Sequence, residues 1–105
     1  MSKTPDRLQA ILDLDRLVHE PARLAVLSVL SGVEWAEFKM VESLTKLTKG
    51  NLSSHLAKLE EGGYVAIHKG YRGKVPQTTL AITKKGRDAL EKYWEQLKQA
   101  APRRT

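Results

Sequence analysis

The sequence contains no cysteine, which excludes disulfides, thiolate metal sites and cysteine nucleophiles. No apolar run approaches the roughly 18 residues of a membrane span, so we expect no membrane partner. Three aspartates among the first 15 residues argue against a secretory signal peptide. These absences fit a reducing compartment, and the expected location is the cytoplasm.

Motifs for metal binding and catalysis are also missing. His19, His55 and His68 are far apart and lack the spacing of metal ligands. The sequence has neither a GxSxG motif nor a P-loop. Ser53, Ser54 and His55 are adjacent, but on a helix they point in different directions and form no nucleophile–base pair. We therefore expect no metal, no cofactor and no enzymatic activity.

Positive charge is concentrated in the middle of the chain. The 105 residues carry a net charge of +6, and the segment 46–87 alone has nine Lys or Arg against two Glu, a net +7. A localised basic region is typical of proteins that bind polyanions, although a solvated surface that maintains solubility is the alternative. The length predicts one domain over residues 1–105 with a modest core.

Apolar spacing and turn residues predict a mainly helical α+β fold. The first helix, about 5–18, is apolar on more than one side. In the helix at about 39–46, we expect Met40, Val41 and Leu44 to face inward. The expected elements are, in chain order, helices at about 5–18, 22–30, 39–46, 49–61 and 84–100, with extended segments at about 35–38, 64–69 and 77–82.

Capping residues predict where two of these helices begin and where one ends. Thr48 and Thr83 are candidate N-caps of the helices at about 49–61 and 84–100. Gly62-Gly63 ends the helix at 49–61, and one of these glycines is expected in the left-handed conformation.

The helix at about 49–61 has one clean apolar face, formed by Leu52, Leu56 and Leu59 at i, i+4 and i+7. Its other face is polar and small, which suits a helix in the DNA major groove, where Asn can pair with adenine and Ser can bind base edges or phosphates. The alternative is that these residues only solvate an exposed helix, and that His55 is a packed flank residue. The candidate DNA contacts on this helix are Lys49, Asn51, Ser53, Ser54, His55 and Lys58.

A basic hairpin, about 69–76, follows this helix. We expect its tip at 70–73, where Arg72 can enter a minor groove in which phosphates concentrate negative potential. Lys69, Tyr71 and Lys74 are candidate contacts beside it, the lysines to phosphates. An ordinary solvated loop is the alternative, but the position directly after a polar helix favours DNA contact.

The terminal helices carry more apolar surface than one neighbour can bury. The first is broadly apolar, and the last has an aromatic stripe. We therefore predict that they join two copies of the chain. The candidate dimer residues are Leu8, Ile11, Leu12, Leu90, Tyr93, Trp94 and Leu97.

The stretches LVHEPARLAVLSVL and LTKGNLSSHLAKLEEGGYVAIHKGYRGKVPQTTLAITKKGRDAL resemble small bacterial and archaeal winged-helix regulators of the ArsR/MarR-like group. The most specific parts are Pro-x-Arg-Leu at 21–24, Asn-Leu-Ser-x-His-Leu at 51–56 and the junction at 82–86. The resemblance implies a winged helix-turn-helix with a two-stranded wing, a homodimer joined by its terminal helices, and a pseudo-palindromic operator. By this resemblance, the polar positions of the helix at 49–61 read DNA and Arg72 matches the wing tip.

The chain departs from the group in two ways. Its lack of cysteine excludes the thiolate metal sensors, and its length leaves little room for a pocket that would bind an effector, so any effector is unknown. The leading hypothesis is a sequence-specific, homodimeric DNA-binding transcriptional repressor. The alternative is a winged helix that binds another protein without specific DNA binding.

Overall fold

A computed structural model describes residues 5–102 of the chain. These residues form an α+β, mainly α fold, which confirms the predicted winged helix-turn-helix class. The elements are, in chain order, α1 (Asp6–Leu12), α2 (Pro21–Ser31), β1 (Ala36–Glu37), α3 (Phe38–Thr45), α4 (Lys49–Glu61), β2 (Val65–Arg72), β3 (Val75–Ile82) and α5 (Lys84–Ala100).

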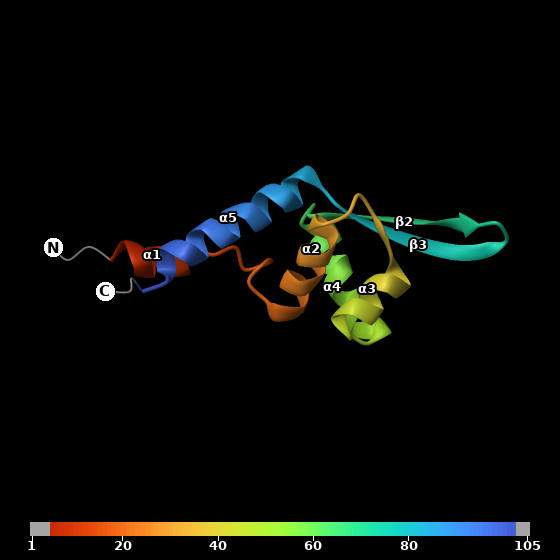
Figure 1. Cartoon of the computed structure of the whole chain (residues 1–105), viewed down its shortest axis with the longest axis horizontal. Coiled ribbons are helices and arrows are strands. Elements are labelled where there is room, and N and C mark those ends of the chain that lie inside the picture. Colours follow the sequence, from red (N-terminus) through yellow and green to blue (C-terminus); the bar gives the residue numbers. More distant parts are fainter. Residues whose placement is uncertain (1–4, 103–105) are drawn as a thin grey trace.

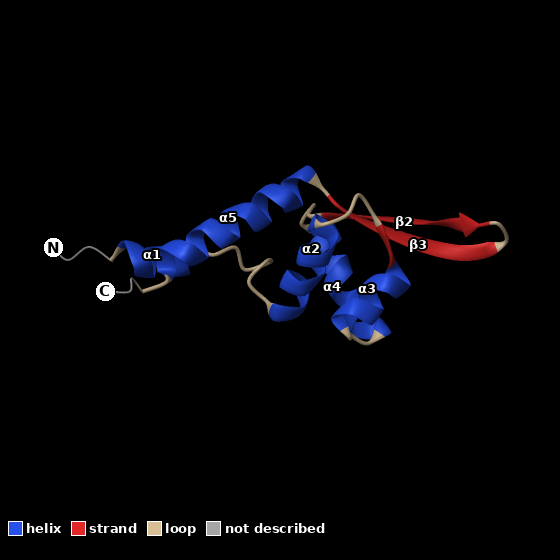
Figure 2. Ribbon diagram, in the orientation of Figure 1, coloured by secondary structure: helices blue, strands red, loops and turns tan. Residues whose placement is uncertain are grey.

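The molecule is elongated, with principal extents of 65 × 26 × 23 Å. Helix α1 lies against the C-terminal half of α5, and this pair forms an arm at one end of the molecule (Figure 1). The β2–β3 hairpin projects from the opposite end, and α2, α3 and α4 lie between the two (Figure 2). The arm and the hairpin therefore extend from a central helical body in opposite directions.

The sheet is antiparallel, with the strand order β1-β3-β2. Tyr71 pairs with Pro76 and Arg72 pairs with Val75, so both β2 residues belong to the ladder. The predicted tip at 70–73 was wrong, because pairing continues to Arg72 and leaves Gly73 and Lys74 as the turn. Gly73 has φ +64°, a left-handed conformation that glycine adopts without steric cost.

The first helix is shorter than the predicted 5–18 and ends at Leu12. Asp15 ends the helical pattern, since its Oδ1 atom accepts hydrogen bonds from the backbone N–H groups of Leu17 (2.8 Å) and Val18 (3.4 Å). Such side-chain bonds offer the backbone an alternative to the helix. Leu14 and Val18 are buried in the core of the same chain, which explains part of the apolar excess.

The third helix also differs from expectation. Val41 is buried, but Met40 and Leu44 are exposed, so the prediction that all three face inward was wrong. The inner face instead follows Phe38, Val41 and Thr45, at i, i+3 and i+7. Helix α3 contacts α2, β1 and β3, and within the described residues these contacts leave Met40 and Leu44 exposed.

The predicted caps are confirmed. The Oγ1 atom of Thr48 accepts from the backbone N–H of Asn51 at 3.1 Å, and that of Thr83 accepts from Gly86 at 3.0 Å. Gly63 has φ +81° just after α4. Helices α4 and α5 therefore begin and end as the sequence predicts. None of the helices within residues 5–102 combines the length and apolarity that crossing a membrane requires.

Candidate nucleic-acid interface

Helix α4 is held to the body by one face. Leu52, Leu56 and Leu59 are buried in the hydrophobic core, together with side chains from α2, α3, β3 and α5. Lys46, at φ +60°, makes the sharp turn between α3 and α4. The opposite face of α4 is left to solvent, and the predicted contacts on it are exposed: Lys49, Asn51, Ser53, Ser54 and Lys58.

His55 differs from the other α4 candidates because it is half-buried against α2. Its Nδ1 atom lies 3.3 Å from Nη1 of Arg23 and 3.5 Å from Oε2 of Glu20. Glu20 is the N-cap of α2, where its carboxylate accepts the backbone N–H groups of Ala22 and Arg23 at 3.0 Å each. Burial raises the pKa of Glu20, but these two hydrogen bonds, followed by the charge interactions with His55 and Arg23, outweigh it and lower the pKa overall.

The hairpin presents cations to solvent along β2 and in its turn. Lys69, Tyr71 and Arg72 lie on β2, and Lys74 lies in the turn itself. All four are exposed, with Arg72 showing 82% of its side-chain surface. Nη1 of Arg72 lies 4.0 Å from Oε1 of Glu37, an exposed pair that contributes little in water. The guanidinium is therefore available to a stronger anion.

The fold brings the helix and the hairpin together. Lys49 and Ser53 of α4 line one hollow with Lys69 of β2, over a floor that includes Phe38 and Ile67. Lys49 also lines a neighbouring hollow with Arg72. Lys49 lines both hollows, so cations from α4 and from the wing lie around it although they are about 20 residues apart in sequence. Glu37, Glu42 and Glu60 also line these hollows.

Sequence reasoning missed Lys39, which lines the same hollow as Lys49 and Arg72. It is exposed on the first turn of α3. Its place in the local sequence gives no periodic or motif signal, but the first helix of a helix-turn-helix crosses the DNA backbone. That general geometry is the signal by which Lys39 could have been included among the candidate phosphate contacts.

The terminal arm has an apolar surface of its own. Ala10 is buried where α1 meets α5, whereas Leu8, Ile11 and Leu12 are exposed on the side of α1 away from Ala10. We call this exposed triplet the α1 apolar face. Trp94 of α5 is also 42% exposed.

The other predicted dimer residues on α5 pack against the core of their own chain, to different extents. Leu90 and Tyr93 are buried in the core, and Leu97 packs against it. Nδ1 of His19 lies 2.9 Å from the Tyr93 hydroxyl, and the Trp94 ring meets the Tyr93 ring edge-on. Tyr93 and Leu90 therefore hold α5 to the body and leave little surface for a partner.

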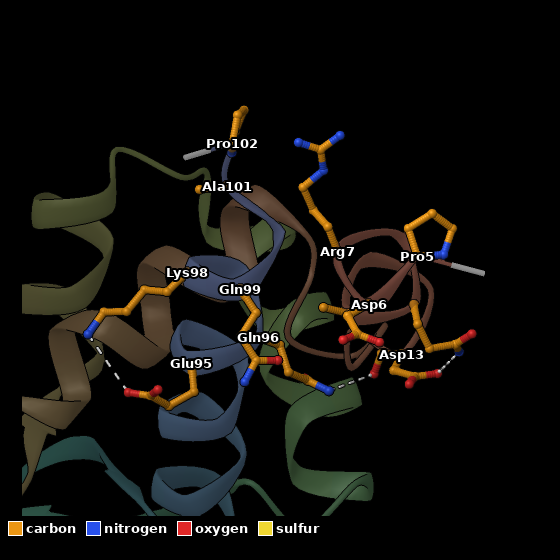
Figure 3. Close-up of a pocket in the computed structure, with 12 residues that line it drawn as sticks. Pro5, Asp6, Arg7, Asp13, Glu95, Gln96, Lys98, Gln99, Ala101 and Pro102 are labelled. Atoms are coloured by element: carbon orange, nitrogen blue, oxygen red, sulfur yellow. Dashed lines mark hydrogen bonds and ion pairs between the residues drawn. The ribbon is translucent and has the colours of Figure 1, made fainter. Parts of the chain in front are cut away.

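A polar groove runs between α1 and the C-terminal end of α5 (Figure 3). Its side chains pair with one another: Gln9 donates to Asp13 at 2.9 Å, and Lys98 lies 3.8 Å from Glu95. The groove is open and carries both signs of charge, so it selects no class of ligand. Within the described residues, His, Asp and Glu side chains form no group of three that could hold a metal ion.

The family comparison agrees with this geometry. Residues 22–101 match the family described as winged helix DNA-binding domain, and the chain therefore belongs to that family. It is a family of DNA-binding regulators and not of enzymes.

The chain is also similar to individual proteins and solved structures. The chain is 39% identical over 79 residues to an uncharacterized protein of Methanocaldococcus jannaschii, covering 74% of this chain and 85% of the relative. The structure of a transcriptional regulator homologue from Pyrococcus horikoshii OT3 superposes with a TM-score of 0.80 and 29% identity, covering 89% and 91% of the two chains. A MarR family regulator from Silicibacter pomeroyi gives a TM-score of 0.65 at 16% identity, covering 90% of this chain and 63% of that one. An ArsR family regulator shares the fold too, with a TM-score of 0.55 at 24% identity, so the resemblance to the ArsR/MarR-like group is confirmed at the level of the fold.

Proposed function

We propose that the chain is a sequence-specific transcriptional repressor that binds duplex DNA as a homodimer. The observation that carries the proposal is the shared surface of α4 and the wing, where Lys49 of the helix lines one hollow with Lys69 and another with Arg72. Lys49, Lys69 and Arg72 all belong to the segment 46–87, whose net charge is +7. A positive surface of this kind attracts the phosphate backbone.

In this proposal the N-terminal half of α4 enters the major groove. Asn51 and Ser54 are short and exposed, so they can approach base edges, where Asn pairs with adenine and Ser pairs with either donors or acceptors. Ser53 and Lys58 contact base edges or phosphates beside them. The wing, 69–76, follows the minor groove or its backbone, with Arg72 and Lys74 nearest to the phosphates.

The dimer in this proposal is joined through the arm. The α1 apolar face and Trp94 are the exposed members of the predicted interface, while Leu97 is partly covered. A two-fold dimer places two α4 helices on successive turns of one DNA face, about 34–36 Å apart. Such a dimer reads a pseudo-palindromic operator and covers DNA that a polymerase would need, which makes repression the expected mode.

Selection of bound duplexes from a random pool tests the proposal. We expect an enriched motif that is an inverted repeat. We also expect the logarithm of the binding constant to fall linearly with the logarithm of the salt concentration. Enrichment of a single half-site without symmetry would remove the dimer from the proposal and keep the DNA-binding function. A complete lack of binding to any duplex at low salt would instead favour a winged helix that binds protein.

A further inference from the structure

Arg23 is a largely buried arginine that ties three parts of the chain together. Only 12% of its side chain is exposed. Its Nε atom donates to the Leu17 carbonyl at 2.7 Å and its Nη2 atom to the Arg16 carbonyl at 3.3 Å. Its Nη1 atom lies 3.3 Å from Nδ1 of His55 on α4. The guanidinium thus links the segment between α1 and α2 to the recognition helix.

This contact determines which nitrogen of neutral His55 carries the proton. A guanidinium has only donors and stays charged in proteins, so Arg23 can only donate to the imidazole. Nδ1 must then be the acceptor, and the proton of the neutral ring lies on Nε2.

Glu20 favours the opposite arrangement, since its Oε2 atom lies 3.5 Å from the same Nδ1 atom. That oxygen already accepts the backbone N–H of Arg23 at 3.0 Å, and it lies 3.8 Å from the Arg23 guanidinium. The carboxylate is therefore satisfied without His55. The shorter contact, from Arg23, decides the tautomer.

The other ring nitrogen of His55 is open to solvent. Nε2 has no hydrogen-bond partner among residues 5–102, and in that range no buried side-chain nitrogen or oxygen lacks a partner. Nε2 must therefore reach water. His55 follows Ser54, which lies on the exposed face of α4, so the ring presents an N–H donor at the edge of that face.

We propose that Arg23 is a positioning residue that holds His55 as an Nε2–H donor for a DNA phosphate at the edge of the major groove. The inference rests on the proposed function, because it needs DNA as the partner. A phosphate fits best because its oxygens only accept, and because a residue on the flank of the helix meets the backbone before the base edges. A neutral donor displaces no counterion, so this contact strengthens binding without adding to its salt dependence.

The tautomer can be measured on the free protein without any DNA. In a ¹⁵N–¹H correlation spectrum of the imidazole groups above neutral pH, we expect His55 with a bare Nδ1 and a protonated Nε2. The signal is assigned by its loss in His55→Gln. Replacement of Arg23 by Met leaves Glu20 beside Nδ1 and should therefore raise the fraction of the tautomer with its proton on Nδ1. A proton on Nδ1 in the wild-type protein overturns the inference whether or not the variant folds.

The phosphate contact is tested with a matched pair of variants on a selected duplex. Gln at position 55 places its amide nitrogen near the Nε2 position, whereas Asn places it near Nδ1. We expect His55→Gln to bind as the wild type does and His55→Asn to bind about 3- to 10-fold more weakly, the range of one ordinary hydrogen bond. Both should keep the wild-type salt slope.

The outcomes separate the inference from the proposed function. If the wild-type protein binds duplex DNA and both variants bind equally, the donor at position 55 is unused and the inference fails alone. If the wild-type protein binds no duplex, the proposed function fails, and the phosphate contact fails with it. The spectrum then still reports whether Arg23 sets the tautomer.

Discussion

The hydroxyl of Tyr64, just after the recognition helix, donates a hydrogen bond to Oδ2 of Asp15, in the segment that joins α1 to α2. Oδ1 of the same carboxylate accepts two backbone N–H groups within that segment. Arg23 makes a second link from this segment to α4, through His55. The segment between the arm and the body is thus bound to the middle of the recognition helix and to Tyr64, just beyond the end of that helix.

The Tyr64 bond gives the stability of the protein a defined dependence on alkaline pH. Burial, followed by the hydrogen bond and the charge of Asp15, raises the pKa of Tyr64 to about 12. A raised pKa in the folded state means that the bond stabilises the fold fully below pH 10, the ordinary value for tyrosine. This stabilisation is lost as the pH rises through about 12.

We therefore expect Tyr64→Phe to lower the free energy of unfolding by about 1.5–3 kcal/mol at neutral pH, the range for a hydrogen bond to a charged group. Urea unfolding across pH 7 to 12 measures the effect, and the variant should lack the alkaline loss assigned to Tyr64. Tyr71→Phe on the exposed wing is the matched control and should leave stability unchanged. An alkaline loss of equal size in Tyr64→Phe would show that another group is responsible.

Local signals predicted α4 and α5 well, and long-range contacts explain where prediction failed. Thr48 and Thr83 cap their helices through bonds to residues three positions away, which sequence reveals directly. The end of α1 depends instead on Asp15 and on its contact with Tyr64, which lies 49 residues further along the chain. Sequence reasoning cannot place such a contact, so it extended the helix through the apolar residues.

In the candidate site, too, local signals predicted some features, whereas features that depend on long-range contacts were missed. Leucine periodicity predicted which face of α4 is exposed, but the position of the hairpin turn depends on how far β2 and β3 pair. That pairing placed Arg72 on the strand and moved Lys74 into the turn. The contact between Arg23 and His55 joins residues 32 positions apart, so the sequence alone could not show that His55 packs beside α2.

Arg72→Ala should weaken duplex binding and reduce the salt slope by about one unit if the guanidinium neutralises one phosphate. Its exposed contact with Glu37 is too weak to hold it against that phosphate. Binding titrations at a series of salt concentrations measure the slope. Lys84→Ala, a charge-matched change at the start of α5 where Lys84 pairs with Asp88, should leave it unchanged. Equal slopes for Arg72→Ala and the wild type would exclude the wing arginine from phosphate binding.

Leu12→Asp should convert the proposed dimer to a monomer. Leu12 is 66% exposed on the α1 apolar face, and a carboxylate buried there without a partner would oppose association. Sedimentation at micromolar concentration should change from twice the chain mass to 11.8 kDa. Leu44→Asp, at a leucine 59% exposed on α3, is the matched control and should stay dimeric. A wild-type mass of one chain would contradict the dimer directly.

The start of α5 offers a final test, because two helical glycines differ sharply in their surroundings. A Cβ atom on Gly86 would lie 2.2 Å from the Tyr64 carbonyl oxygen and 2.9 Å from Cγ1 of Ile82. That carbonyl is held in place, since it accepts the Thr83 N–H at 3.0 Å. Gly50, in the first turn of α4, has no such neighbour within 4 Å.

Gly86→Ala should therefore destabilise the protein by about 1–3 kcal/mol, because the first turn of α5 must move away from Tyr64. Gly50→Ala should be neutral or stabilising by up to about 1 kcal/mol, because alanine favours the helix and meets no obstacle. Urea unfolding of both variants at neutral pH measures the difference. If Gly86→Ala proves as stable as Gly50→Ala, α5 does not pack against the start of β2 as closely as its geometry indicates.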